Sequence, residues 1–130
     1  PLFMGLISSC TNTKVDAKNL DGKWIIVEVK GEKVNKEKMP FIEFKVAENK
    51  VHGNAGCNIF NTTMKLDESN VSAISFNQAV STMMACPDME LEGKVFNTFE
   101  NVAAVKAGKT ENEMLLVDKD GATLLVLSRN

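Results

Sequence analysis

The chain has 130 residues, a length that fits one domain and excludes a two-domain organisation. Its 15 basic and 17 acidic residues give a net charge of -2 without any block of like charge, so nothing attracts a phosphate backbone and we expect no nucleic-acid partner. With one His, one Trp and no Tyr, acid-base chemistry would fall to carboxylates, lysines or cysteines. The composition therefore favours a protein without enzymatic activity.

The N-terminus carries a sorting signal in our interpretation. Residues 1–9 are uncharged and mostly apolar, but they are too few to cross a bilayer, which takes about 20 residues in a helix. We interpret 1–9 as the remnant of a truncated lipoprotein signal peptide. The next residue completes the sequence Ile-Ser-Ser-Cys, which resembles the bacterial lipobox, whose cysteine receives a diacylglyceryl group before cleavage. A chance cysteine is the alternative.

This interpretation divides the chain into three parts. Residues 10–19 are predicted to be the lipidated Cys10 with a polar tether, and residues 20–130 the globular domain. Two or three acyl chains hold a small domain on a bilayer far more firmly than one chain does. We therefore expect a monomer of the cell envelope that reaches the membrane through Cys10. Thr11, which is not an Asp, favours the outer membrane by resemblance to enterobacterial sorting.

Most of the domain shows the two-residue period of β-strands. In the segment 41–46, for example, Ile42, Phe44 and Val46 fall on one face, with Glu43 and Lys45 on the other. Polar turns separate the runs. The pattern predicts strands at 24–29, 41–46, from 51 onward, 59–66, 71–76, 102–107, 114–117 and 122–128.

One segment has helical spacing instead. Between residues 87 and 103 the apolar side chains form a single stripe, and Pro87 and Asp88 suit a helix N-terminus. The charged residues of this segment, Glu92 among them, are expected to face away from the sheet. Short antiparallel strands with one helix indicate an α+β fold, a strongly curved antiparallel sheet or partly open β-barrel of seven to eight strands.

Two loops carry a family resemblance. The sequences HGNAGCNIF at 52–60 and STMMACP at 81–87, with Gly22 and Trp24 upstream, closely resemble the META domain family, also called HslJ-like after a bacterial heat-shock protein. The matching residues of the signature are Gly53, Asn54, Gly56, Cys57, Asn58, Phe60, Ser81, Thr82, Met84, Ala85 and Cys86. The resemblance implies a barrel-like α+β fold, an envelope or stress-linked role and no established enzymatic activity, and we expect no cofactor.

Two of the three cysteines remain once Cys10 is lipidated. An even number in a compartment that permits disulfides favours pairing, so we expect Cys57 and Cys86 to be neighbours. Two separate buried thiols are the alternative. Asn54, Asn58 and Thr82 are expected to bond exposed backbone groups in the two loops.

Catalytic and metal-binding interpretations find little support. A metal site from His52, Cys57 and Cys86 matches no standard zinc spacing. A hydrolase built on the same residues needs a free thiolate, which oxidising surroundings disfavour. We therefore predict a non-catalytic module that binds a protein or a hydrophobic ligand or has a structural role, with an enzyme using an unrecognised thiol or carboxylate as the alternative.

If the domain binds a ligand, a cleft is expected where the helix leaves the sheet uncovered. Its lining would be the large apolar residues beside the two loops, with Asn58 and Thr82 as polar groups that orient the ligand. The apolar set is Phe60, Met83, Met84 and Met89. The alternative is that these side chains close the core, since Met often fills gaps there.

Overall fold

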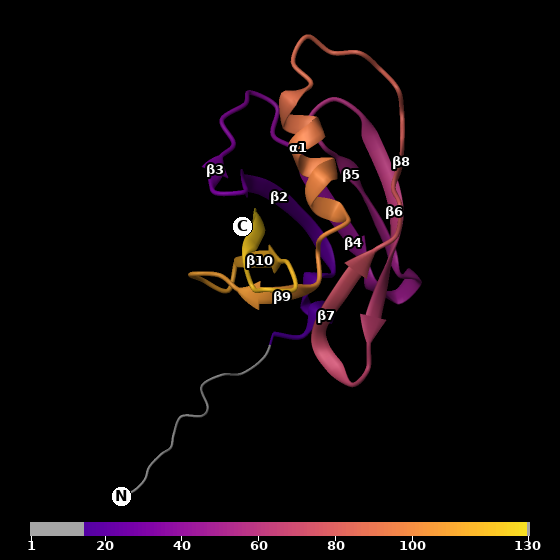
Figure 1. Ribbon diagram of the computed structural model, residues 1–130, viewed down its shortest axis with the longest axis vertical. Helices are drawn as coiled ribbons and strands as arrows, with labels where there is room; N and C mark the ends of the chain where they lie inside the picture. Colours follow the sequence, from indigo (N-terminus) through magenta and orange to yellow (C-terminus); the bar gives the residue numbers. More distant parts are fainter. Residues whose placement is uncertain (1–14, 130) are drawn as a thin grey trace, which may run out of the picture.

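The computed structural model describes residues 15–129, so Cys10 and the lipobox lie outside the described residues. Figure 1 shows a strongly curved sheet with one helix against it. Short 3-10 helices occur at η2 (Ala17–Leu20) and η3 (Val46–Glu48). The remaining elements are β2 (Gly22–Val29), β3 (Glu32–Lys33), β4 (Phe41–Lys45), β5 (Lys50–Asn54), β6 (Ile59–Asp67), β7 (Asn70–Phe76), β8 (Val80–Ser81), α1 (Glu90–Phe99), β9 (Ala104–Ala107), β10 (Glu113–Val117) and β11 (Thr123–Ser128).

The sheet closes on itself. Its ten strands follow the order β11-β10-β9-β7-β6-β5-β4-β2-β3, with β8 beside β6, and β11 also pairs with β2. All of these pairings are antiparallel. The predicted α+β fold with a curved antiparallel sheet is confirmed. The strands beyond the predicted number are β3 and β8, which have two residues each and no period to detect.

The alternation along the strands fixes which side chains enter the core. In β6, Phe60, Thr62 and Met64 are buried, and the residues between them are exposed, as the two-residue period predicts. Trp24 of β2 is fully buried, and its indole N–H donates to the Leu20 carbonyl at 2.7 Å. A buried indole N–H needs such an acceptor.

The packed domain begins before Leu20. Ala17 and Leu20 are both buried, and Val15 packs against the core. The Ser72 hydroxyl of β7 donates to the Val15 carbonyl. Residues 15–19, predicted as part of the tether over 10–19, therefore belong to the fold, and the rest of that prediction lies outside the described residues.

The helix is also shorter than predicted. It spans Glu90–Phe99, not 87–103. At its start, the Asp88 carboxylate accepts the Glu90 N–H at 3.0 Å, which satisfies one of the free donors of the first turn. At its end, the Ala103 N–H donates to the Val117 carbonyl at 2.8 Å, so the chain has already joined the sheet there. Within residues 15–129, no helix is long and apolar enough to span a membrane.

Aromatic packing fixes α1 on the inner face of the sheet. Phe60 is fully buried, with its ring centroid 5.0 Å from that of Phe99 and 5.7 Å from that of Phe96. Phe99 also meets Phe76 of β7 edge to face at 5.3 Å. Aromatic pairs at these separations add to the stabilisation from burial. Phe60 is thus a core residue, and its predicted place in a ligand cleft is wrong.

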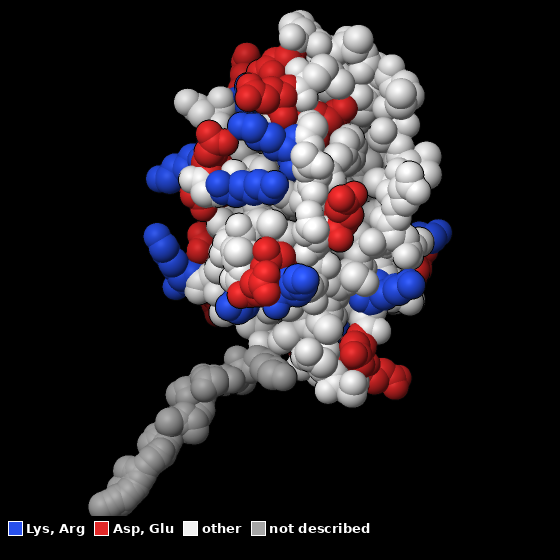
Figure 2. All heavy atoms as spheres, viewed as in Figure 1, with Lys and Arg blue, Asp and Glu red and all other residues white. Residues whose placement is uncertain are grey.

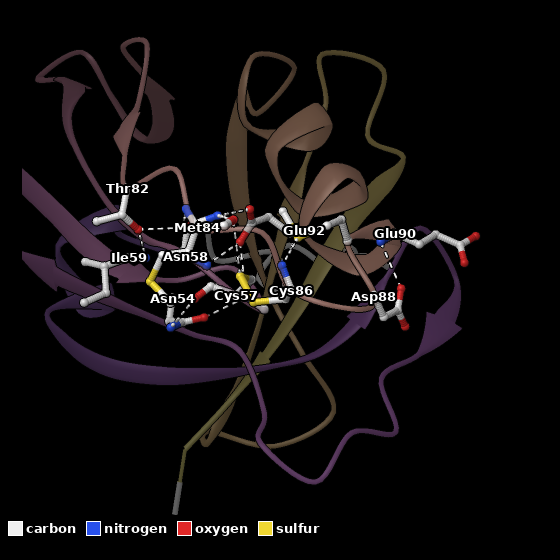
Figure 3. Close-up of a disulfide and its surroundings, with 12 residues drawn as sticks. Asn54, Cys57, Asn58, Ile59, Thr82, Met84, Cys86, Asp88, Glu90 and Glu92 are labelled. Atoms are coloured by element: carbon white, nitrogen blue, oxygen red, sulfur yellow. Dashed lines mark hydrogen bonds between the residues drawn. A yellow bond between two sulfur atoms is a disulfide. The ribbon is translucent and has the colours of Figure 1, made fainter.

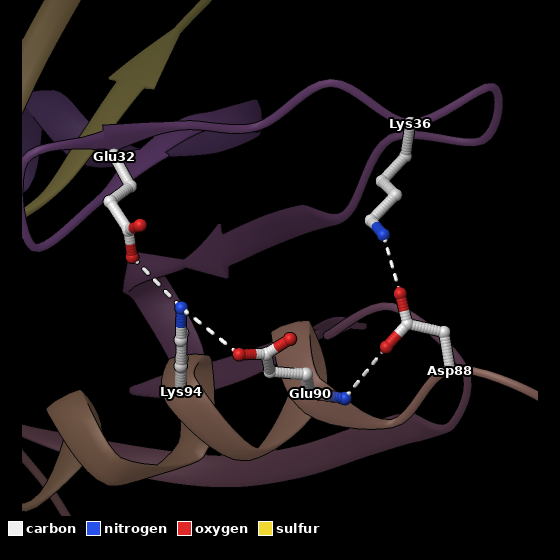
Figure 4. A network of polar contacts seen from close by, with 5 residues as sticks. All are labelled: Glu32, Lys36, Asp88, Glu90 and Lys94. Carbon is white, nitrogen blue, oxygen red and sulfur yellow. Dashed lines mark hydrogen bonds and ion pairs between the residues drawn. The ribbon is translucent and has the colours of Figure 1, made fainter.

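The opposite side of α1 is tied to the β2–β3 region by exposed ion pairs (Figure 4). The Lys94 ammonium lies 2.8 Å from the Glu32 carboxylate, and that of Lys36 lies 2.6 Å from the Asp88 carboxylate. The side-chain hydrogen bond and the charge of Lys94 lower the pKa of Glu32, and the same contact raises the pKa of Lys94. Exposed pairs of this kind stabilise a fold only weakly.

We expect Phe60→Ala to lower the free energy of unfolding by about 3–5 kcal/mol, because it removes the centre of the aromatic cluster and leaves a cavity. Met83→Ala is the control: its side chain is 91% exposed, so the change should stay within about 0.5 kcal/mol. Chemical denaturation measures both. Equal effects of the two substitutions would contradict the assignment of Phe60 to the core.

Candidate functional site

The two signature loops meet at the start of α1 (Figure 3). Cys57, between β5 and β6, forms a disulfide with Cys86, which precedes the helix, and their Cα atoms lie 6.1 Å apart. This separation is within the usual disulfide range of roughly 4.4 to 6.8 Å. The predicted proximity of the two cysteines is confirmed, and the alternative of two separate thiols is wrong.

Asn58 joins the two loops beneath the disulfide. Its side chain is buried, its Oδ1 accepts the Met84 N–H at 2.7 Å, and its Nδ2 donates to the Met84 carbonyl at 3.1 Å. A side-chain amide here satisfies both backbone groups of one residue, as a neighbouring strand would. The Thr82 hydroxyl donates to the same Oδ1 at 2.7 Å and accepts the Ile59 N–H at 3.2 Å. Asn58 and Thr82 thus bond backbone groups as predicted, but the Asn58 side chain bonds the Met84 backbone of the second loop and not the glycine-permitted bend of its own loop.

Asn58, Thr82 and Met84 form a junction between the two loops, and Glu92 connects this junction to the helix. Its Oε1 accepts the N–H groups of Cys57 at 3.0 Å and Asn58 at 2.5 Å, and its Oε2 accepts Asn58 Nδ2 at 2.7 Å. Burial of this carboxylate is the largest single influence on its pKa and acts to raise it. The hydrogen bonds from the Asn58 side chain, the Asn58 backbone and the Cys57 backbone together outweigh burial, so the pKa of Glu92 lies below its ordinary value.

Two glycines give the first loop its path. Gly56 has φ +140°, and a Cβ there would point at the start of α1, with its nearest atom 3.5 Å away on Glu92. At Gly53 a Cβ would come within 2.2 Å of the Phe41 carbonyl oxygen, so only glycine fits. Asn54 closes the turn, because its Oδ1 accepts the Gly56 N–H at 2.8 Å. Asn54 thus has the backbone-bonding role predicted for it.

The methionines beside the junction face solvent. The exposed fractions are 91% for Met83, 61% for Met84 and 39% for Met89. Core filling, one of the two sequence interpretations of these residues, is wrong for this reason, and their role in binding stays a prediction. Asn58 and Thr82 bond each other and the backbone, and their predicted role in orienting a ligand stays a prediction. Ala85 is exposed, and Ser81 lies beside Phe60 in the β8–β6 pairing.

The sheet surface that α1 leaves open lies elsewhere. A hollow of about 500 Å³ opens between the helix and the segment joining β7 to β8. Phe76, Phe96 and Phe99 form its apolar part. Apolar surface beside the helix is therefore uncovered, as expected, but the residues that line it are not the predicted ones.

The described contacts of His52 are with Asn61 and Phe41 and do not involve the cysteine pair. Its Nδ1 lies 3.0 Å from Asn61 Oδ1, and its ring packs 6.2 Å from that of Phe41. The sulfur atoms of Cys57 and Cys86 are bonded to each other, so neither supplies a thiolate as metal ligand or nucleophile. In residues 15–129, no three His, Cys, Asp or Glu side chains are grouped as a metal ion would require.

Glu92 lies in a different position from the one its sequence pattern predicted. It was expected to face solvent, but it is 5% exposed. A signal did exist, because positions 92, 95 and 99 have the spacing of one helix face, and Val95 and Phe99 belong to the apolar stripe. A carboxylate on that face, beside a Gly-rich loop with free N–H groups, indicates an anchor for the loop.

Reduction of the Cys57–Cys86 disulfide should lower the free energy of unfolding without unfolding the domain. The chain-entropy model gives about 3–4 kcal/mol for a loop of this length. The junction retains Asn58 and Glu92, and the core is untouched. Denaturant titration with and without reductant tests this, with Cys57→Ala/Cys86→Ala as a reductant-insensitive control. Complete unfolding on reduction would show that the core is weaker than its packing suggests.

Glu92→Gln should destabilise the domain by roughly 1–3 kcal/mol at neutral pH, because an amide cannot accept from all three donors. Since folding lowers the pKa of Glu92, the ionised carboxylate stabilises the fold above its ordinary pKa of 4.5. That contribution is lost as the pH falls through the folded-state pKa. The stability difference between wild type and Glu92→Gln should therefore shrink on acidification.

The exposed Glu90, in the same turn, provides the control for this measurement. Glu90→Gln should change the stability little at any pH. Urea titrations of the three proteins between pH 3 and 7 give the comparison. A pH-independent difference between wild type and Glu92→Gln would contradict the ionised, hydrogen-bonded state of this carboxylate.

Comparisons with known proteins agree with this fold. An NMR structure of a protein from Burkholderia xenovorans is 18% identical with a TM-score of 0.67, covering 100% of this chain and 98% of that one. A crystal structure of a DUF4847 family protein from Bacteroides vulgatus is 17% identical with a TM-score of 0.60, covering 86% of this chain and 94% of that one. At such identities the likeness extends to the fold alone.

The search of curated proteins found no match. The family model of the META domain, in contrast, matches residues 17–130. That range includes both signature loops, the disulfide, α1 and every strand of the sheet. The chain belongs to the META domain family.

Proposed function

We propose that this protein is a non-catalytic lipoprotein of the cell envelope, anchored through Cys10 in the outer membrane, and that it serves as a binding module in envelope or heat stress. The observation that carries the proposal is the Cys57–Cys86 disulfide. Disulfides persist in oxidising compartments outside the cytoplasm. The lipobox-like sequence before Cys10 and membership of a family without established enzymatic activity support the same conclusion.

The surface around the second loop supports a binding role. Residues 71–87 contain no charged side chain, and several large apolar residues in and beside this segment are exposed. Figure 2 shows the consequence: the side of the molecule over β8 and the loop before α1 is almost free of charge. The exposed large apolar residues of this segment and its neighbours are Ile59, Val71, Val80, Met83, Met84 and Met89. Exposed apolar surface of this kind often marks a contact with another macromolecule, and Met adapts to varied partners.

The second signature loop, which contains Met83 and Met84, is also fixed in place. The Met84 backbone is bonded on both sides by Asn58, and Cys86 is bridged to Cys57. A fixed loop loses little conformational entropy when a partner binds, which favours affinity. We therefore assign the partner contact to Met83 and Met84, with the junction beneath them in a supporting role.

The proposed anchor would direct this surface away from the membrane. Val15 contacts β7 through Ser72, and the extended link from Cys10 to Val15 spans at most about 18 Å. Figure 1 shows the β6–β7 turn and the loop between β8 and α1 at opposite ends of the long axis. A domain tethered near β7 would thus present the methionines to the surrounding compartment.

The enzyme alternative has less support. Its thiol version requires a free sulfur, and the sulfurs of Cys57 and Cys86 are joined. Its carboxylate version would use Glu92, the buried carboxylate of the junction, but both oxygens of this group already accept N–H donors. A base engaged in this way is poorly placed to take a proton from a substrate.

Cys10→Ser in the full precursor should move the protein from the membrane fraction to the soluble fraction, or leave it unprocessed. An alkyne-bearing fatty acid supplied to the cells should label the wild type and not the variant. Cys57→Ala/Cys86→Ala is the matched control and should remain in the membrane fraction. Unchanged membrane association and labelling of the Cys10 variant would refute the anchor.

A further inference from the structure

A second apolar surface lies on the outer side of the sheet, on strands that the proposed function does not use. It forms the floor of a groove of about 870 Å³ between the β2–β3 hairpin and the β9–β10 turn. The floor consists of Val27, Leu115 and Val126, from three adjacent strands. A groove of this size is in the range that small ligands occupy, which is roughly 300 to 1,000 Å³.

A strand irregularity creates this floor. In the β11–β2 pairing, Val126 faces Glu28 and Leu127 faces Ile26, so Val27 has no partner. Such a bulge bends the strand and redirects side chains. Val126 is 8% exposed but lies outside the contiguous core. Its side chain lines the groove on the outer side of the sheet.

The walls of the groove carry lysines. Lys30 and Lys33 come from the β2–β3 hairpin and Lys109 from the β9–β10 turn. No ion pair joins these three ammonium groups to a carboxylate among residues 15–129. On the face shown in Figure 2, basic side chains project on the side where Figure 1 places β3 and the β9–β10 turn, with acidic side chains between them.

Two carboxylates also line the groove, and one of them has a local role. Glu113 accepts the Lys109 N–H at 2.9 Å, and a Cβ on Gly108 would lie 2.6 Å from its Cγ. It is thus part of the turn that forms the wall. With Glu28 as the other carboxylate, the ammonium groups outnumber the carboxylates, and the groove has an excess of positive charge.

The wall formed by the β2–β3 hairpin is conformationally fixed. Lys30 and Gly31 have φ values of 48° and 84°, which are those of a tight two-residue hairpin turn. The Lys30 N–H donates to the Leu124 carbonyl at 2.8 Å, so this turn is joined to the groove's own floor strand. A lysine at such a turn tip projects beside the apolar floor with little backbone freedom.

We propose that this groove binds a single-chain fatty carboxylate as a monomer. Its alkyl chain lies on Val27, Leu115 and Val126, and its carboxylate lies among Lys30, Lys33 and Lys109. Burial of apolar surface supplies the attraction for the chain, and unpaired ammonium groups beside a low-dielectric floor supply the charge selectivity. The ligand therefore needs both a chain and a negative head group.

NMR titration tests the proposal on the full chain carrying Cys10→Ser, so that no acyl group of the protein competes. The probe is dodecanoate at monomeric concentrations. We expect saturable amide shifts confined to 27–33, 107–115 and 123–126. Dodecyltrimethylammonium, which has the same chain with a positive head group, should bind at least roughly tenfold more weakly, since the lysines repel it.

Charge reversal supplies the matched variants. Lys30→Glu/Lys33→Glu/Lys109→Glu should weaken dodecanoate binding by roughly tenfold or more. The control makes the same change in net charge at three exposed lysines of β4, β5 and β6, and it should leave the affinity unchanged. That control is Lys45→Glu/Lys50→Glu/Lys65→Glu. Ala107→Trp, at an exposed position of the groove, should block the alkyl chain without altering charge.

Several results would overturn the proposal. These are the absence of saturable shifts, shifts centred on Met83 and Met84, or equal binding of the cationic detergent. Equal weakening by the two triple variants would show a general charge effect. Binding to phosphatidylglycerol vesicles without binding of monomeric dodecanoate would assign the face to a bilayer. Binding of polyglutamate in place of dodecanoate would assign it to an acidic protein.

Discussion

The carboxylate of Glu92 is the interaction on which the site depends. A buried carboxylate is unfavourable unless hydrogen bonds replace its water, and here the donors are two backbone N–H groups and one side-chain amide. Those donors belong to the turn between β5 and β6, so the helix and the sheet share one polar contact. Asn58 extends that contact to the Met84 backbone. The carboxylate therefore fixes the β5–β6 turn to the helix directly and the Met84 segment through Asn58.

The two flanks of α1 are fixed by different forces. On the sheet side, buried hydrogen bonds and the aromatic cluster around Phe60 set its position. On the β3 side, the exposed pair of Lys94 with Glu32 is screened by solvent and salt. The disulfide covers the same end of the helix as the Glu92 contact. Placement of the helix thus depends mainly on the buried side, and the outer side can vary without moving the signature loops.

The strands could be predicted because alternation is a local signal, and the cysteine pair because two cysteines remain once Cys10 is set aside. Alternation places Phe60 and Met64 inside, and counting leaves Cys57 with Cys86. The site could be predicted only in part. Glu92 was missed because charge normally favours solvent, and its compensation comes from N–H donors that lie distant in sequence. Core filling by Met83 was a wrong alternative because its residue type suggests burial, whereas backbone bonds to its neighbour Met84 fix the segment on the surface.

The pairing of β11 with β2 has a consequence for the order in which the molecule can assemble. Ile25 pairs with Ser128, so the closing contact joins residues from nearly opposite ends of the described chain. This contact is costly to form, because the entropy of closing the large loop is lost before the contact is made. Until β11 arrives, β2 and β10 each present an unpaired edge. The nascent domain is therefore incomplete until its last strand is available, and protection from intermolecular strand pairing comes with that final step.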